Sequence, residues 1–95
     1  MENFNNIVKK FSYELKDPSL ANYATQILAS YVIFTFPRQI QDIEVDELYV
    51  AIYLSAKKMF DADNLDIEQE CFDREVDFDR VNFYLNKIDL VLHDI

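Results

Sequence analysis

The chain has 95 residues, enough for one domain, and 51% of them are hydrophobic, enough for a core at that size. Its net charge of −9 repels nucleic-acid phosphates and anionic lipid surfaces, which argues against direct binding to nucleic acid or membrane. Glycine is absent, which excludes phosphate-binding loops and dinucleotide fingerprints, so we expect no cofactor and a helical fold.

Apolar residues at spacings of three and four predict the helices in chain order. The first covers residues 2–16, with Asn3 at the cap position. The second covers residues 18–34 and follows Asp17-Pro18, a cap residue and a first-turn proline. The third covers residues 45–60, with Met59 among the apolar residues that surround nearly its whole circumference. That pattern is typical of a central helix packed on several sides.

The last two helices complete the predicted domain. A short fourth helix covers residues 65–72, with four side chains directed inward: Leu65, Ile67, Cys71 and Phe72. The fifth covers residues 78–93 and is capped by Asp77. Glu44, Asp46 and Glu47 crowd the first turn of the third helix, where acids complement the helix dipole. The sequence thus predicts an all-α fold, a single five-helix domain over residues 1–95 around a buried third helix.

The cysteine content and the apolar segments indicate a cellular environment. Cys71 is the one cysteine, so no internal disulfide can form, which fits a reducing compartment. Residues 1–10 lack the pattern of a signal peptide, and no apolar stretch approaches the roughly 20 residues of a membrane span. We expect a soluble intracellular protein, cytoplasmic or nuclear.

An acidic run over residues 61–79 is the most polar part of the chain. It has two interpretations, a solvated face or a docking surface for a basic partner. A calcium loop that begins at Asn64 would place Gln69 where the sharp turn needs glycine. The nine acids of this candidate surface are Asp61, Asp63, Asp66, Glu68, Glu70, Asp73, Glu75, Asp77 and Asp79.

The remaining reactive side chains do not indicate an enzyme. Acidic neighbours are expected to raise the pKa of Cys71, and Cys71 with His93 falls short of a structural zinc site. No pattern indicates the cleft of paired titratable groups that acid–base chemistry needs. Tyr49, Tyr53 and Phe83 lie off the main apolar stripes, either at the edge of the core or as anchors of an interface.

Three segments carry a resemblance to the cyclin box. LYVAIYLSAKKMFDAD, from Leu48 to Asp63, resembles the third helix of that family, which ends in an aliphatic run, Ala-Ser-Lys, an aromatic residue and acids. LANYATQILASYVIFTF and the final VNFYLNKIDLVL are similar to its second and fifth helices. The resemblance implies five helices around a central third and a non-enzymatic protein-binding module.

The resemblance also implies a contact surface. Kinase-activating members of that family contact the kinase through a lysine at the end of the third helix and a glutamate in the fifth helix. Lys57 or Lys58 falls at the first position, beside Tyr53, and Asn86 falls at or near the second. These four residues are the predicted partner-binding site.

Two functional hypotheses follow. The first is a cyclin-box-like adaptor or regulator that binds a kinase or another protein partner. The alternative is a small acidic inhibitor or immunity-type protein, whose residues 61–79 block a basic nucleic-acid-binding partner by charge mimicry. Raised salt should weaken charge mimicry steeply, whereas contacts between buried apolar side chains should survive it. The oligomeric state stays open.

Overall fold

The computed structural model describes residues 2–60 and 62–93. Helices account for most of these residues and strands for none, which confirms the all-α prediction. The bounds of the third and fifth helices are those predicted from the apolar spacing. In chain order the elements are α1 (Glu2–Glu14), α2 (Pro18–Thr35), the 3-10 turn η1 (Asp42–Glu44), α3 (Val45–Phe60), the 3-10 turn η2 (Ala62–Asn64), α4 (Ile67–Asp73) and α5 (Phe78–His93).

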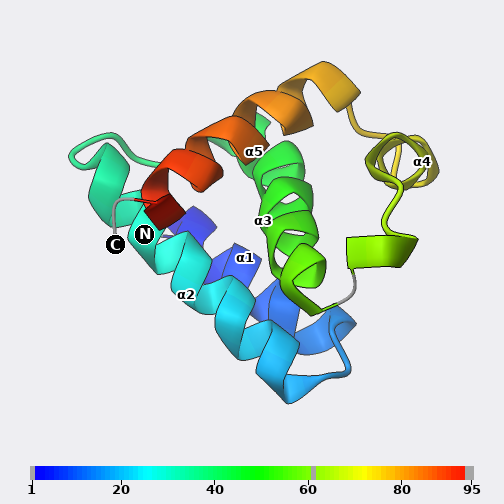
Figure 1. The fold of residues 1–95 in the computed structure, drawn as a ribbon. Helices are drawn as coiled ribbons and strands as arrows, with labels where there is room; N and C mark the ends of the chain where they lie inside the picture. Colours follow the sequence, from blue (N-terminus) through cyan, green and yellow to red (C-terminus); the bar gives the residue numbers. More distant parts are fainter. Residues whose placement is uncertain (1, 61, 94–95) are drawn as a thin grey trace.

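Helix α3 runs through the middle of the molecule, as its apolar circumference predicts (Figure 1). Every side chain from Leu48 to Ala56 is buried, and the helix packs against α1, α2 and α5. Met59, expected in this apolar surface, is instead 68% exposed, so the last turn of α3 is not covered on all sides. The core is therefore centred on the first three turns of α3.

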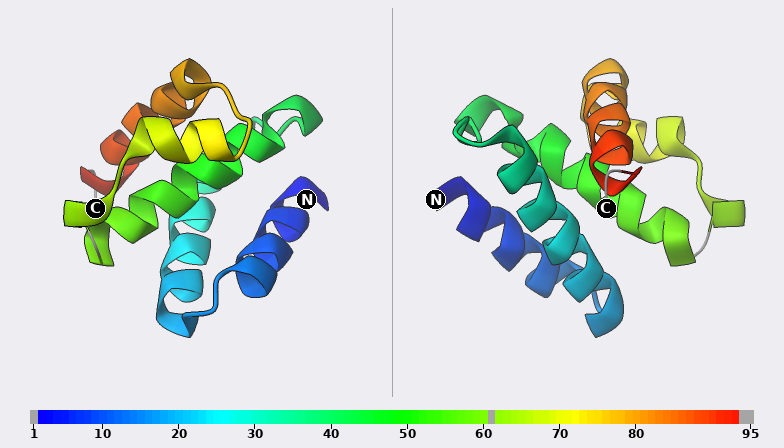
Figure 2. Two further views of the ribbon diagram at one scale, coloured as in Figure 1. Left: turned by 90° about the vertical axis from the view of Figure 1, so that its right-hand side faces the viewer. Right: turned by 60° about the vertical axis from the view of Figure 1, so that its left-hand side comes forward.

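The other helices surround α3 on different sides (Figure 2). Helices α1 and α2 lie side by side on one flank, and α5 crosses α3 and also contacts α2. Helix α4 packs against α5 and lies across α3 from α2 (Figure 1). No helix in the described part of the chain has both the length and the apolar character needed to cross a membrane.

Two of the predicted helix caps are confirmed, and one is wrong. The Asp17 carboxylate accepts a hydrogen bond from the Ser19 N–H at 2.9 Å, and Asp77 caps α5 in the same way. Asn3 does not cap α1, because the helix already includes Glu2. Its side-chain amide instead donates to the loop that joins α2 to α3, and so ties the two segments together.

Helix α4 begins later than predicted and turns one aromatic side chain outward. Asp66 caps it by accepting from the Gln69 N–H at 3.1 Å, so the helix starts at Ile67. Cys71 points inward and is buried, whereas Phe72 is 78% exposed. Neighbouring residues of a helix point about 100° apart, so both cannot face the core of a helix packed on one side. Phe72 is thus a surface residue and not a core residue.

Candidate functional site

Residues 36–43, which form the loop after α2 and the first residues of η1, expose large apolar side chains beside a groove. Phe36 is 80% exposed and Ile43 is 76% exposed. The groove, called here the loop groove, has a volume of about 610 Å³ and lies between this loop, the start of α1 and the end of α2. It is lined by the apolar residues Phe4, Val32, Phe36, Pro37, Ile40 and Ile43 and the polar residues Glu2, Asn3, Arg38, Gln39, Gln41 and Asp42.

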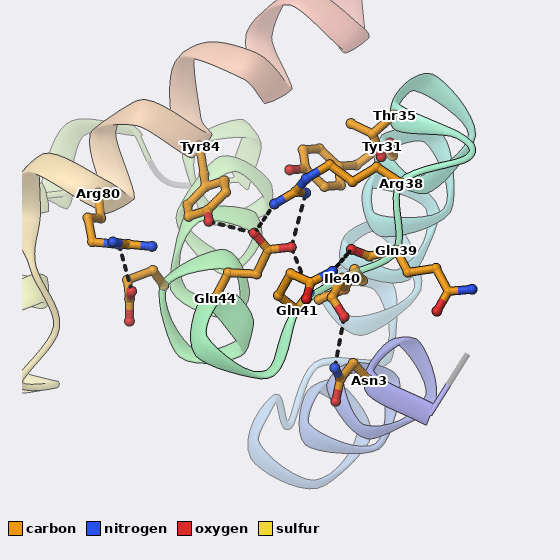
Figure 3. A network of polar contacts seen from close by, with 11 residues as sticks. Asn3, Tyr31, Thr35, Arg38, Gln39, Ile40, Gln41, Glu44, Arg80 and Tyr84 are labelled. Carbon is orange, nitrogen blue, oxygen red and sulfur yellow. Dashed lines mark hydrogen bonds and ion pairs between the residues drawn. The ribbon is translucent and has the colours of Figure 1, made fainter.

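A buried carboxylate holds this loop against the helices (Figure 3). Glu44 is only 2% exposed, and each of its two carboxylate oxygens accepts two hydrogen bonds. Oε1 accepts from the Arg38 guanidinium at 3.1 Å and from the Gln41 N–H at 3.0 Å. Oε2 accepts from Arg38 at 2.6 Å and from the Tyr84 hydroxyl at 2.9 Å. The bidentate arginine and the two neutral donors satisfy the charge fully, which a buried carboxylate requires.

The protonation of this network follows from its geometry. Burial raises the pKa of Glu44, but the hydrogen bonds from Arg38, Gln41 and Tyr84 outweigh it and lower the pKa below the ordinary value of 4.5. Burial, together with the adjacent carboxylate, raises the pKa of Tyr84 to about 12. At neutral pH Glu44 is therefore ionised and Tyr84 protonated. The buried Tyr31 hydroxyl lies beside Arg38 (Figure 3).

A second polar cluster joins α1, α3 and α4 and involves two of the predicted partner-binding residues. Arg74 pairs with Glu70 at 3.2 Å, and its guanidinium lies 4.6 Å from the centre of the Tyr53 ring. Lys57 lies 3.7 Å from Glu70 and 5.5 Å from the same ring centre. Tyr53 is consequently 9% exposed and belongs to the core cluster. It is a covered side chain here, not a surface anchor.

The other predicted partner-binding residues and the off-stripe aromatic residues divide between surface and core. Lys58 and Asn86 are exposed, on α3 and on α5. Phe83 is 54% exposed, whereas Tyr49 is buried, stacks on Phe11 at 5.1 Å and donates its hydroxyl hydrogen to Glu14. Within the predicted contact surface, Lys58 and Asn86 are therefore exposed and Lys57 is partly exposed.

The acidic surface lies along η2, α4 and the start of α5. Asp61 lies outside the described residues, and Glu70 is half-buried and ion-paired. Arg74, the one basic residue of the run, points inward to Glu70, so it does not neutralise the outer acids. The exposed members are Asp63, Asp66, Glu68, Asp73, Glu75, Asp77 and Asp79.

Cys71, the single cysteine, is buried, and its thiol is not activated as a nucleophile. Burial, with the neighbouring charge of Glu70, raises the pKa of the Cys71 thiol, as its surroundings in the sequence predict. Among residues 2–60 and 62–93, no group of three or more His, Cys, Asp or Glu side chains is arranged to hold a metal ion.

Sequence reasoning missed the Glu44 network, because it placed Glu44 at the solvated start of α3. The spacing of Gln41 and Glu44 carried one signal, since a polar residue followed three positions later by Glu is typical of a reciprocal cap. Tyr84 lies 40 residues away in the sequence and carried no such signal.

Comparison with known proteins gave no matching family model, no matching curated protein and no matching solved structure.

Proposed function

We propose that this chain is a non-enzymatic protein-interaction module, a cyclin-box-like adaptor or regulator that binds a kinase or another protein partner. One observation carries the proposal. Among residues 2–60 and 62–93, eleven large apolar side chains are at least 36% exposed. Four of them, Ile33, Phe34, Phe36 and Ile43, belong to one short segment, and Phe36 and Ile43 line the loop groove. Clustered exposed apolar side chains on a soluble domain are typical of interaction surfaces.

The helix arrangement supports the cyclin-box-like part of the proposal. Five helices with the third at the centre are what that resemblance implies, and here α1, α2 and α5 pack on α3. Lys58 and Asn86 remain accessible for a contact at the end of α3 and on α5. Lys57 and Tyr53 lie next to that surface, where Lys57 pairs with Glu70 and Tyr53 lies against the Arg74 guanidinium.

A second candidate function is supported by the acidic surface. Seven of its carboxylates are exposed, while the single arginine of the run is ion-paired on the inner side. A continuous negative field of this kind suits an inhibitor that mimics nucleic acid and blocks a basic partner.

Capture of partners from a lysate of the native host separates the two functions. We would compare the wild type with Lys58→Glu/Asn86→Ala, called the helix-end variant, and with Asp63→Asn/Asp73→Asn/Glu75→Gln, called the acid variant. The acid variant keeps the capping carboxylates Asp66 and Asp77, so the helices stay intact. Each capture is done at low and at high salt.

The two functions predict opposite patterns. A partner that survives high salt and is lost only with the helix-end variant supports the adaptor. A partner that high salt removes and the acid variant fails to capture supports the inhibitor instead. Absence of any partner that is enriched over an unrelated acidic domain would contradict both interaction functions.

A further inference from the structure

We propose that the loop groove binds a short segment of a partner protein in which apolar side chains stand next to lysine or arginine. This inference rests on the proposed function as an interaction module, and it names the site and the chemistry of the segment. It does not depend on the helix-end residues Lys58 and Asn86.

The groove offers an apolar surface built from three parts of the chain. Phe4 comes from α1, Val32 from α2 and Ile40 from the loop, and all three are partly buried against the core. Phe36 and Ile43 form more exposed walls, at 80% and 76%. Apolar side chains of a partner would remove these surfaces from water, which is the main source of affinity at such contacts.

The exposure of the walls favours a peptide segment over a small molecule. Small-molecule pockets enclose about 70–90% of their ligand's surface. Walls as exposed as Phe36 and Ile43 cannot enclose a ligand to that extent. A helix or extended segment laid along a groove needs only one face covered.

The charge at the groove favours a basic segment. Arg38 is neutralised by its bidentate pair with Glu44, at 3.1 and 2.6 Å, so it adds little positive field. Glu2 and Asp42 are exposed at the groove, and Asp42 accepts a hydrogen bond from the neutral Asn3 amide at 2.8 Å. Together with the net charge of −9, this field attracts cations and disfavours a second copy of the same acidic chain.

The groove is also fixed in shape before a partner arrives. The Glu44 carboxylate holds Arg38 and the Gln41 backbone from one side. The Asn3 amide holds the Ile40 carbonyl at 2.8 Å from the other side. A loop that is already ordered loses less conformational entropy on binding, which strengthens the complex.

Selection from a displayed library of random peptides, with the full chain as bait, tests this inference. The enriched sequence is synthesised with a fluorescent label, and its dissociation constant is measured by anisotropy. Three variants are compared with the wild type: Phe36→Ser/Ile43→Ser in the groove walls, Glu2→Gln/Asp42→Asn in the groove charges, and Phe83→Ser/Leu90→Ser as a matched control. The control side chains are 54% and 61% exposed on α5, outside the groove.

We expect enriched peptides that combine apolar residues with lysine or arginine. The groove-wall variant should weaken binding by about tenfold or more, because wall side chains act as anchors. The charge variant should weaken it less and reduce its salt dependence, and the control should bind like the wild type. Thermal unfolding of each variant checks that the fold is retained.

Three results would overturn the inference: no enriched peptide, enriched peptides without basic residues, or unchanged affinity in the groove-wall variant. None of them alone refutes the interaction function. If the lysate capture still returns a partner that the helix-end or acid variant loses, the module stands and only the groove is wrong. If both experiments return nothing, the interaction function fails as well.

Discussion

Glu44 combines a full charge with a side chain that is 2% exposed, so its neighbours determine whether it stabilises the fold. An unpaired carboxylate in this place would be strongly destabilising, but Arg38, Gln41 and Tyr84 fill all of its nearest acceptor positions. The role of Glu44 could not be predicted from the sequence, because its partners come from the loop and from α5. Only tertiary structure brings Tyr84 to it.

Replacing the arginine tests this dependence. We expect Arg38→Met to lower the free energy of unfolding by about 3 kcal/mol at neutral pH, because it leaves the Glu44 carboxylate buried with two neutral donors. Urea unfolding of the two proteins measures the difference. Arg80→Met serves as the control, since its pair with Glu47 at 3.1 Å lies near the surface and should contribute about 1 kcal/mol or less.

The pH dependence of that loss has a defined sign. In the wild type the pKa of Glu44 lies below 4.5. The ionised carboxylate therefore stabilises the folded state fully above pH 4.5, and this stabilisation is lost as the pH falls through the lowered pKa. Without Arg38, burial dominates and raises the same pKa, so acid should neutralise the unpaired charge. The stability difference between wild type and Arg38→Met should therefore begin to shrink above pH 4.5, as the pH falls through the raised pKa of Glu44 in the variant, and continue to shrink down to its lowered pKa in the wild type. A constant difference would contradict the account.

At the scale of the elements, local signals determined the long helices and failed for the short one. The apolar spacing was sufficient to place α3 and α5, and the cap residues Asp17 and Asp77 marked the starts of α2 and α5. Helix α4 has seven residues, which is too short for a periodic pattern to fix its ends. Its start depends on the Asp66 cap, and its orientation depends on packing against α5.

The end of α4 contains a residue in an unfavourable backbone conformation. Glu75 has a φ of 58°, in the left-handed region. Its N–H donates to the Phe72 carbonyl at 3.2 Å, and the Val76 N–H donates to the Cys71 carbonyl at 3.0 Å. These two bonds form a Schellman motif, in which glycine is the usual residue at the left-handed position. A glutamate there has a conformational cost because of its Cβ atom.

Glycine at this position should stabilise the protein. We expect Glu75→Gly to raise the free energy of unfolding by about 1 kcal/mol, because glycine adopts this conformation without a steric penalty. The midpoint of thermal unfolding, followed by circular dichroism, measures it. Glu75→Gln removes the charge but keeps the Cβ atom, so it should give a smaller change. Equal gains from both substitutions would assign the effect to charge instead of backbone geometry.

On the scale of the whole molecule, charge and core are separated. The interior is centred on α3, where Leu48, Ala51 and Ile52 have no exposed surface, and its one buried charge among the described residues, Glu44, is hydrogen-bonded. The acids gather on the outer side of η2, α4 and α5. Composition predicted the excess of acids, and the central helix followed from its apolar pattern. Neither predicted the loop groove, because the groove requires α1, α2 and the loop to meet in space.

The excess charge should itself reduce stability, because like charges repel in the compact state. The acid variant, Asp63→Asn/Asp73→Asn/Glu75→Gln, lowers the net charge from −9 to −6 by removing three negative charges. None of the three lies in the first turn of an α-helix, so no favourable contact with a helix dipole is lost.

We therefore expect the acid variant to be more stable than the wild type at low salt by about 1 kcal/mol or less, a few tenths for each charge. The gain in stability should nearly vanish in about 1 M salt. The Debye length there is about 3 Å, so repulsion between exposed charges that are farther apart is largely screened. Urea unfolding at both salt concentrations measures it. Asp46→Asn is the matched control, because Asp46 pairs with Lys10 at 3.6 Å and lies in the first turn of α3, so its loss should lower stability. A gain of the same size from Asp46→Asn would show that net charge alone, and not the crowding of acids on one surface, sets the effect.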